Sequence, residues 1–168
     1  MKPAEQEILV VKKGTFKRDY DFLFNGRVIA NLNCSKGFGR KAVVKIGSKD
    51  WTFVKKGFWK QTIEIQAGQS PYEKRKFELD WRHRGKFEGP DGKLYQLRQT
   101  NCWKSIWSWQ DDNKNSIGDL KSNAFSHKKR GTIHFSQPLK DELLCMFVLG
   151  WFMLTGYEES AAVAAAAS

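Results

Sequence analysis

An uncharged stretch of fifteen residues near the end of the chain constrains its fold more than any other feature. Leu143 to Tyr157 reads LLCMFVLGWFMLTGY, whereas the residues before it form short strand-like segments. A helix that is apolar on every side is buried in protein or in lipid, and a bilayer span needs about 20 residues. The sequence therefore predicts a buried helix at about residues 139–157, enclosed by a sheet. A tail-anchored membrane segment is the alternative.

The chain before this segment contains twelve strand-like runs. Apolar and polar residues alternate in many of them, and Trp103, Trp107 and Trp109 are expected to share one face of a strand. Asn25-Gly26 and Pro90-Asp91-Gly92 are typical hairpin turns, which favours antiparallel connections. The runs cover residues 7–12, 19–24, 27–33, 41–47, 50–56, 61–66, 73–80, 84–88, 93–99, 102–109, 115–121 and 129–136.

A repeat organises these strands. Lys17, Lys60 and Lys104 lie 43 and 44 residues apart in the similar phrases KKGTFKRDYDF, KKGFWKQTIEI and RQTNCWKSIWSW. Four strands per repeat also suit a propeller blade, but three blades cannot close a propeller. A barrel of about eleven strands has room for a helix. We predict a mainly β fold, a closed twelve-stranded antiparallel barrel around a hydrophobic C-terminal helix, as one domain over residues 1–157.

The helix is expected to fill the barrel, with Phe147, Trp151 and Leu154 inside. About ten large apolar side chains at roughly 2 kcal/mol each amount to about 20 kcal/mol of gross burial. Ser136 is predicted to cap the helix and Pro138 to lie in its first turn, followed by two acidic residues at the positive end of the helix dipole. The low-complexity tail, residues 158–168, is a continuation of the helix, a frayed end, or foreign to the natural chain.

The chain is strongly basic. Its formal net charge is +11, and the strand-rich part, without the charged residues next to the helix ends, has 28 Lys and Arg against 14 Asp and Glu. Such an excess attracts phospholipid headgroups, nucleic acid or acidic proteins. The alternative is that the charge serves solubility alone.

Cys34, Cys102 and Cys145 are widely spaced and are predicted to be reduced thiols. The N-terminus has no pattern of a secretory signal, so a cytoplasmic location is expected, with peripheral membrane association as an extension of it.

In layout the chain resembles the tubby-like superfamily, which includes the tubby C-terminal domain, the phospholipid scramblases and the LURP-one-related proteins. The resemblance covers Glu7 to Tyr157 and rests on the strand count, the KKGFWK-type repeats and the terminal apolar segment. Its compact size is similar to that of the small LURP-one-like members. The resemblance implies a twelve-stranded barrel around a hydrophobic helix, and it implies binding of anionic phospholipid headgroups or membrane surfaces by basic residues outside the barrel. The predicted anion-binding residues are Lys17, Arg18, Lys36, Arg40, Lys55, Lys56, Lys60, Arg98, Lys104, Lys128, Lys129 and Arg130.

Nucleic acid is the second candidate partner, because basic residues interleaved with aromatic ones bind single strands by stacking and phosphate contact. Phe16, Phe58, Trp59 and Trp103 would be the stacking set. Packing inside the barrel explains the same aromatics. The third hypothesis is a scaffold without a small ligand.

Other motifs predict little chemistry. The basic glycine-rich segment 35–41 could contact an anion through its amides or simply connect two strands. Asp111, Asp112, Asn113 and Asn115 are interpreted as a hairpin turn, because the segment fails the calcium-loop pattern. His83, His127 and His134 lack metal-ligand spacing. We expect no metal, no cofactor and no enzymatic activity.

Overall fold

The structure is a computed structural model, and it describes residues 4–14, 18–34, 40–57, 61–69, 74–80, 84–89, 91–123 and 129–168, except the side chain of Lys129. Twelve strands are followed by one helix, α1 (Asp141–Ala166). The strands are β1 (Gln6–Lys13), β2 (Asp19–Phe24), β3 (Arg27–Cys34), β4 (Lys41–Ile46), β5 (Lys49–Lys56), β6 (Thr62–Ala67), β7 (Lys74–Leu79), β8 (Gly85–Glu88), β9 (Leu94–Asn101), β10 (Ile106–Gln110), β11 (Ser116–Ser122) and β12 (Lys129–Phe135).

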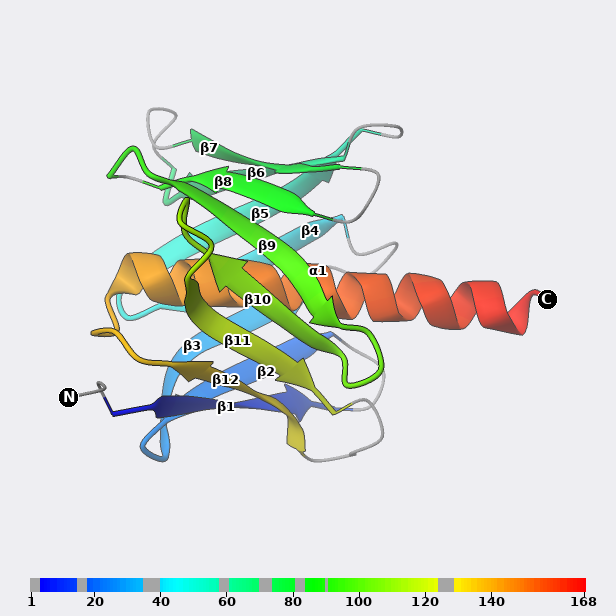
Figure 1. Cartoon of the computed structure of the whole chain (residues 1–168), viewed down its shortest axis with the longest axis horizontal. Helices are drawn as coiled ribbons and strands as arrows, with labels where there is room; N and C mark the ends of the chain where they lie inside the picture. Colours follow the sequence, from blue (N-terminus) through cyan, green and yellow to red (C-terminus); the bar gives the residue numbers. More distant parts are fainter. Residues whose placement is uncertain are drawn as a thin grey trace.

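The strands form a closed barrel in which each pairs with its neighbours in sequence (Figure 1). All pairings are antiparallel, and β1 closes the barrel on β12 with Ile8 opposite Ile133. The register of this last pairing shifts between Val10 and Val11, which lie opposite Gly131 and Lys129. The predicted closed twelve-stranded antiparallel barrel is therefore confirmed.

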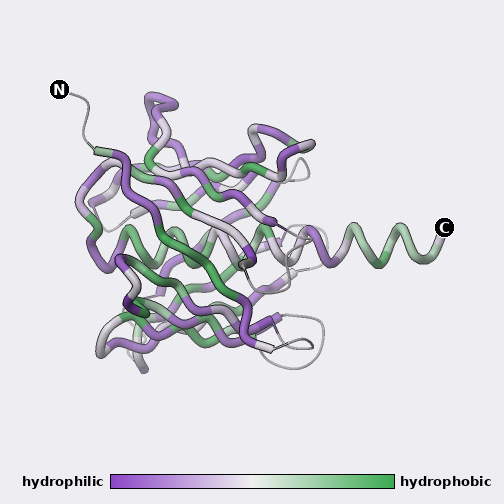
Figure 2. The backbone as a smooth tube through the Cα atoms, turned by 90° about the horizontal axis from the view of Figure 1, so that it is seen from below, coloured by the Kyte–Doolittle hydropathy of each residue, from purple (hydrophilic) through white to green (hydrophobic). Residues whose placement is uncertain are grey.

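Helix α1 runs lengthwise through the barrel and projects from one end of it (Figures 1 and 2). Every residue from Leu144 to Thr155 is buried. Phe147, Trp151 and Leu154 have no exposed surface, as predicted. A helix buried on all sides is expected to be apolar all round, which is why this segment lacks the one-sided pattern of a surface helix.

Aromatic contacts join the helix to strands on different sides of the barrel. Trp151 packs edge-on against Tyr20 of β2, with ring centroids 5.9 Å apart, and Phe147 lies 5.5 Å from Phe135 of β12. On another side, the ring of Phe152 lies 6.0 Å from that of Phe53 of β5. These contacts show the barrel wall and the helix forming one continuous core.

Glycines let the helix approach the wall closely. A Cβ added at Gly150 would lie 2.6 Å from Nε1 of Trp109 on β10. A Cβ on Gly118 of β11 would collide with the ring of Phe147. Aromatic rings therefore occupy the space that larger side chains at these positions would need.

The helix begins later than predicted, and of the alternatives for the tail the structure shows a continuation of the helix. It begins at Asp141 after Lys140, which makes no side-chain cap hydrogen bond, so the predicted cap at Ser136 and first-turn role of Pro138 are wrong. Asp141 and Glu142 do lie in the first turn. The helix continues to Ala166 because the tail is rich in alanine, the residue with the highest helix propensity.

Trp103 is the clearest error in the strand assignments. We expected it on the same face as Trp107 and Trp109, but it lies in the turn before β10 and is 96% exposed, whereas the other two are buried. The side chain of Asn101 accepts a hydrogen bond from the Lys104 amide, and Ser105 adopts a positive φ of 50°. The spacing of the tryptophans matches the two-residue period of a strand, but this turn ends that period before Trp103.

The predicted hairpin chemistry is confirmed at two described turns. Asn25 and Gly26 have φ angles of 50° and 77°, as a tight hairpin between right-twisted strands requires. The Asp111 carboxylate accepts hydrogen bonds from the backbone and side-chain nitrogens of Asn115. The hydrogen bond from the backbone amide is the main reason why the pKa of Asp111 lies below its usual value. Within the described residues, no helix combines the length and apolarity needed to traverse a bilayer.

Candidate functional site

At the end of the barrel from which α1 emerges, the inward-facing side chains change from apolar to positively charged. On β5, Trp51 and Phe53 face inward and the next position in the row is Lys55. Counting back from the inward-facing Tyr20 of β2, the preceding position in that row is Arg18. Two cations therefore occupy positions that the strand pattern assigns to the core. We call this end the exit mouth; its described polar residues are Arg18, Arg40, Lys55, Gln61, Ser105 and Arg130, around helix residues 155–160.

Arg18 binds the helix through four contacts. One terminal guanidinium nitrogen donates to the Phe152 carbonyl oxygen at 3.0 Å and to Oγ1 of Thr155 at 2.9 Å. The other forms an ion pair with Glu159 at 3.4 Å. The guanidinium also lies 5.4 Å from the centre of the Phe152 ring, within the range of a cation–π contact. Arg18 is thus largely occupied by the protein itself.

Arg130 binds the preceding carboxylate of the helix, that of Glu158. It forms an ion pair of 3.0 Å with Glu158, and both side chains are mostly buried. The hydroxyl of Ser105 donates a second hydrogen bond to Glu158 at 2.9 Å. Because Glu158 and Glu159 are consecutive, the two arginines fix the helix where it leaves the barrel.

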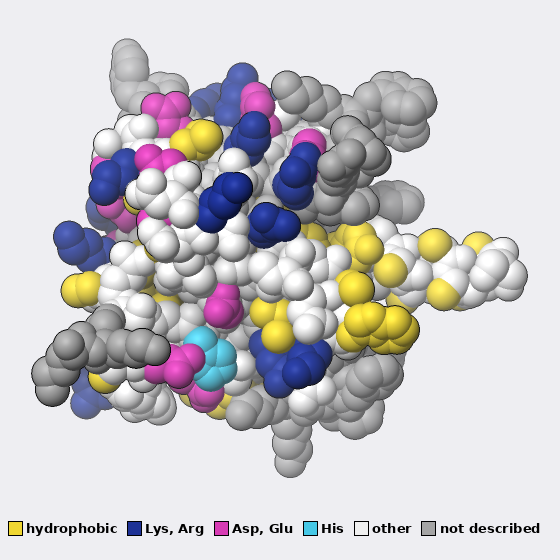
Figure 3. Space-filling view, in the orientation of Figure 1, with side chains coloured by type: hydrophobic (Ala, Val, Ile, Leu, Met, Phe, Trp, Pro, Cys, Tyr) yellow, Lys and Arg dark blue, Asp and Glu magenta, His cyan; other side chains and the backbone are white. Residues whose placement is uncertain are grey.

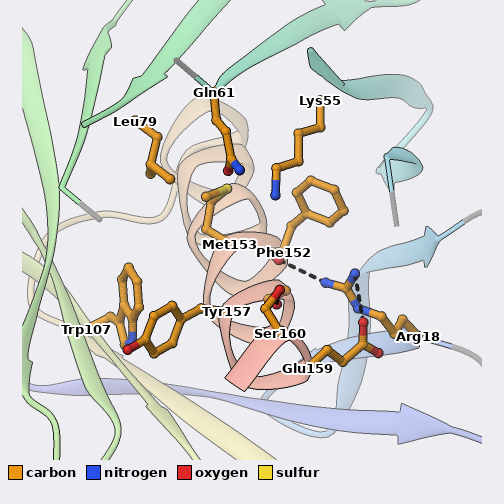
Figure 4. Close-up of a pocket in the computed structure, with 11 residues that line it drawn as sticks. Arg18, Lys55, Gln61, Leu79, Trp107, Phe152, Met153, Tyr157, Glu159 and Ser160 are labelled. Carbon is orange, nitrogen blue, oxygen red and sulfur yellow. Dashed lines mark hydrogen bonds and ion pairs between the residues drawn. The ribbon is translucent and has the colours of Figure 1, made fainter. Parts of the chain in front are cut away.

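A cavity of about 240 Å³ lies beside the ion pair of Arg18 and Glu159, between α1 and the barrel wall (Figure 4). Lys55 and Gln61 point toward it from one side, and Trp107 and Tyr157 lie on the other, with ring centroids 5.6 Å apart. The described residues that line it are Arg18, Lys55, Gln61, Leu79, Trp107, Phe152, Met153, Gly156, Tyr157, Glu159 and Ser160.

Lys55 is the cation of this cavity whose charge is least compensated. Burial lowers the pKa of its amine, and the charges of Arg18 and Arg40 lower it further. Within the described part of the chain, the structure gives its amine no hydrogen bond or ion pair, whereas Arg18 is paired with Glu159. Arg40 is held nearby, because its carbonyl oxygen accepts a hydrogen bond from the Lys55 amide at 2.7 Å. The exit mouth therefore brings together four of the predicted anion-binding residues, Arg18, Arg40, Lys55 and Arg130.

The other described candidates do not join this group as closely. Lys56 faces outward and pairs with Glu64 at 2.8 Å, and Arg98 is exposed on β9 opposite Ser108. Lys104 is exposed in the turn that ends at Ser105. On the barrel face seen in Figure 3, Lys and Arg side chains are interspersed with Asp and Glu. That part of the exterior is of mixed charge.

Several sequence predictions lie outside the described residues. They are the roles of Lys17, Lys36, Lys60 and Lys128, the side chain of Lys129, most of the segment 35–41, and the stacking residues Phe16, Phe58 and Trp59. His83 and His127 belong to the same group. His134 lies on β12, 3.6 Å from both Glu5 and Glu7. Among the described residues, no group of three or more His, Cys, Asp or Glu side chains is arranged to hold a metal ion.

Sequence reasoning missed the acidic and uncharged members of the site. We assigned Glu158 and Glu159 only to the helix end, and did not consider Gln61, Tyr157 or Ser160. The alternation of inward-facing and outward-facing residues could have identified both cations. Lys55 lies two positions after Phe53, the last inward-facing apolar residue of β5, and Arg18 lies two positions before Tyr20, the first one of β2. No protein-family model, curated protein or solved structure matches the chain.

Proposed function

We propose that this protein is a non-enzymatic binding protein of the tubby-like type that recognises anionic phospholipid headgroups or membrane surfaces through its exit mouth. The observation that carries the proposal is the placement of Arg18, Arg40 and Lys55 together at this end of the barrel. Cations near an anionic lipid surface are attracted by about 1 kcal/mol each. A closed barrel around its C-terminal helix is also the layout that the tubby-like resemblance implies.

Exposed apolar groups lie at the same end and support a membrane partner. The turn that bears Trp103 is joined to the exit mouth by the hydrogen bond between Ser105 and Glu158. Trp103 is 96% exposed, and Val163, on the part of α1 beyond the barrel, is 70% exposed. Tryptophan and apolar helix faces beside lysine and arginine are typical of protein segments at a lipid interface. The proposal places the protein at the cytoplasmic face of a membrane.

Co-sedimentation with vesicles tests the proposal. We expect binding to vesicles of phosphatidylcholine with phosphatidylserine, weaker binding as salt is raised, and little binding to phosphatidylcholine alone. Lys104→Glu should weaken binding about fivefold or more, since about 1 kcal/mol is expected for each lysine near the surface. Lys49→Glu changes the charge equally on an exposed residue at the opposite end of the barrel and is the matched control. Equal binding to neutral and anionic vesicles, or equal effects of the two variants, would contradict the proposal.

Nucleic acid remains the second candidate because Trp103 is exposed directly beside Lys104, as base stacking next to a phosphate contact requires. A single-stranded oligonucleotide added to the same preparation separates the two functions. Quenching of tryptophan fluorescence with a steep dependence on salt, without vesicle binding, would favour nucleic acid.

A further inference from the structure

The cavity at the exit mouth has one polar side and one apolar side. Lys55 and Gln61 supply an amine and an amide on one side (Figure 4). Leu79, Met153 and Trp107 supply the apolar surface. This division matches a ligand that is itself amphiphilic, since ligand pockets are mainly apolar with a few polar groups that fix orientation.

The charge of the site specifies the sign of the ligand's head. Lys55 is partly buried and lies near two other cations, and a buried charge without a partner is costly. Arg18 already has Glu159, the Phe152 carbonyl and Thr155 as partners. An anionic head beside Lys55 would supply the compensating charge that the described residues lack.

The volume of the site specifies the length of the tail. The cavity measures about 240 Å³, and a water-sized group takes up about 30 Å³. It therefore holds roughly eight such groups, which corresponds to one unbranched chain of medium length with its head. A complete phospholipid with two long chains exceeds this space.

We propose that the cavity binds one amphiphilic anion, a medium-length alkyl chain with a carboxylate or phosphate head. The head lies against Lys55 and Gln61, and the chain runs between Leu79, Met153 and Trp107. The proposal deepens the proposed function, because it concerns the same end of the barrel and names a single-chain anion as the ligand that this end encloses.

Glu159 is a negatively charged residue of the protein at the same cavity, and it disfavours the binding of a second negative charge. It is about half exposed, lines the cavity, and pairs with Arg18 through one contact of 3.4 Å. Its negative charge opposes an incoming anionic head. Removing that charge while keeping the side-chain shape should therefore strengthen binding.

The test uses the full-length protein, titrated with octanoate, octyl phosphate, octanol and acetate and followed by calorimetry. We expect saturable binding of one octanoate or octyl phosphate per chain, at least tenfold weaker binding of octanol, and no binding of acetate. Charged hydrogen-bonded contacts contribute differences of this size. Octanol binding as tightly as octanoate, or the absence of saturable binding by both anions, would overturn the proposal.

Three variants locate the site. Lys55→Met, which keeps the length and apolar stem of the side chain, should weaken octanoate binding about tenfold or more. Lys56→Met is the matched control, because Lys56 faces outward and is paired with Glu64. Glu159→Gln should strengthen octanoate binding several-fold, and this gain in affinity cannot come from a failure to fold. Unchanged affinity in both Lys55→Met and Glu159→Gln would place the ligand elsewhere.

The vesicle assay tests membrane association and the titration tests the cavity, so each can give a negative result while the other is positive. Binding to anionic vesicles without binding of octanoate or octyl phosphate would refute the cavity proposal and leave membrane association standing. Saturable binding of octanoate without any preference for anionic vesicles would refute membrane association and identify a site for free amphiphilic anions.

Discussion

Two glycines on the buried helix provide a direct measurement of how tightly the barrel encloses it. Gly150 and Gly156 lie on the same helix, within Asp141–Ala166, and can both be replaced by alanine. Alanine is about 1 kcal/mol more favourable than glycine in a helix interior. This gain is common to both variants, so their difference reports only what the added methyl group meets.

The surroundings of the two glycines differ sharply. A Cβ at Gly156 would lie 3.4 Å from the Arg18 guanidinium, an ordinary contact with the end of a long side chain. At Gly150 it would lie 2.6 Å from Nε1 of Trp109 and 3.0 Å from a methyl group of Leu120. Extra volume in a well-packed core typically costs about 1 to 3 kcal/mol.

The ring of Trp109 has little freedom to move aside. It is fully buried and packs edge-on against Phe77 and Phe87, at centroid distances of 5.8 and 6.3 Å. We therefore expect the methyl group at Gly150 to meet most of the overpacking cost. Gly156→Ala should be about 1 kcal/mol more stable than the natural protein, and Gly150→Ala about 1 to 3 kcal/mol less stable than Gly156→Ala.

Thermal and urea unfolding, followed by circular dichroism, measure both values. In a chain of this size 1 kcal/mol shifts Tm by about 2 to 4 °C, so the two variants should differ by about 2 to 12 °C. Equal stability of the two variants would mean that Gly150 is not pressed against the barrel wall. The close packing of the helix against the barrel wall, and with it the geometry of the exit mouth, would then be refuted.

The other predictions concern thiols and pH. Cys102 is exposed and should react with Ellman's reagent within the time of mixing, whereas burial raises the pKa of Cys34 to about 11 and that of Cys145 to about 12. These two thiols should react slowly at pH 8, Cys145 only on unfolding, and mass spectrometry showing early labelling of Cys145 would contradict the packing. Because burial lowers the pKa of Lys55 in the folded state, the unfolded chain binds more protons at alkaline pH, and stability due to this residue should rise as pH approaches its ordinary pKa of 10.5. Lys55→Met should accordingly be at least as stable as the natural protein at pH 7, with an advantage that fades above pH 10, and urea titrations showing a loss at pH 7 or no dependence on pH would refute this.

The architecture could be predicted because its signals are local and repeated. The alternation of apolar and polar residues in β5 and β6 depends only on neighbouring positions. The continuous apolar run from Leu143 to Tyr157 needs enclosure whatever its partners are. Strand number and helix together leave few ways to bury all the apolar faces, so a closed barrel around the helix followed from the sequence.

Local pattern failed where side-chain hydrogen bonds determine the backbone. The spacing of Trp103 from Trp107 resembles a strand, but the side chain of Asn101 and the positive φ of Ser105 make a turn there. The start of the helix was misplaced for the opposite reason: the prediction assumed a side-chain cap at Ser136, and Lys140 precedes the first turn without any side-chain cap. Such choices depend on small energy differences that the surrounding fold overrides.

The sequence by itself determined that an apolar helix had to be enclosed by strands and that the chain is basic, because both properties depend on residue type and spacing. Only the tertiary structure decided which charges meet. Arg18 and Glu159 are separated by most of the chain, and the barrel closure brings them within 3.4 Å. Lys55 became part of a cavity because strand register set it one step beyond the core, where the helix leaves the barrel. Electrostatic and packing energies depend on distances through space, and those distances exist only once the barrel has closed.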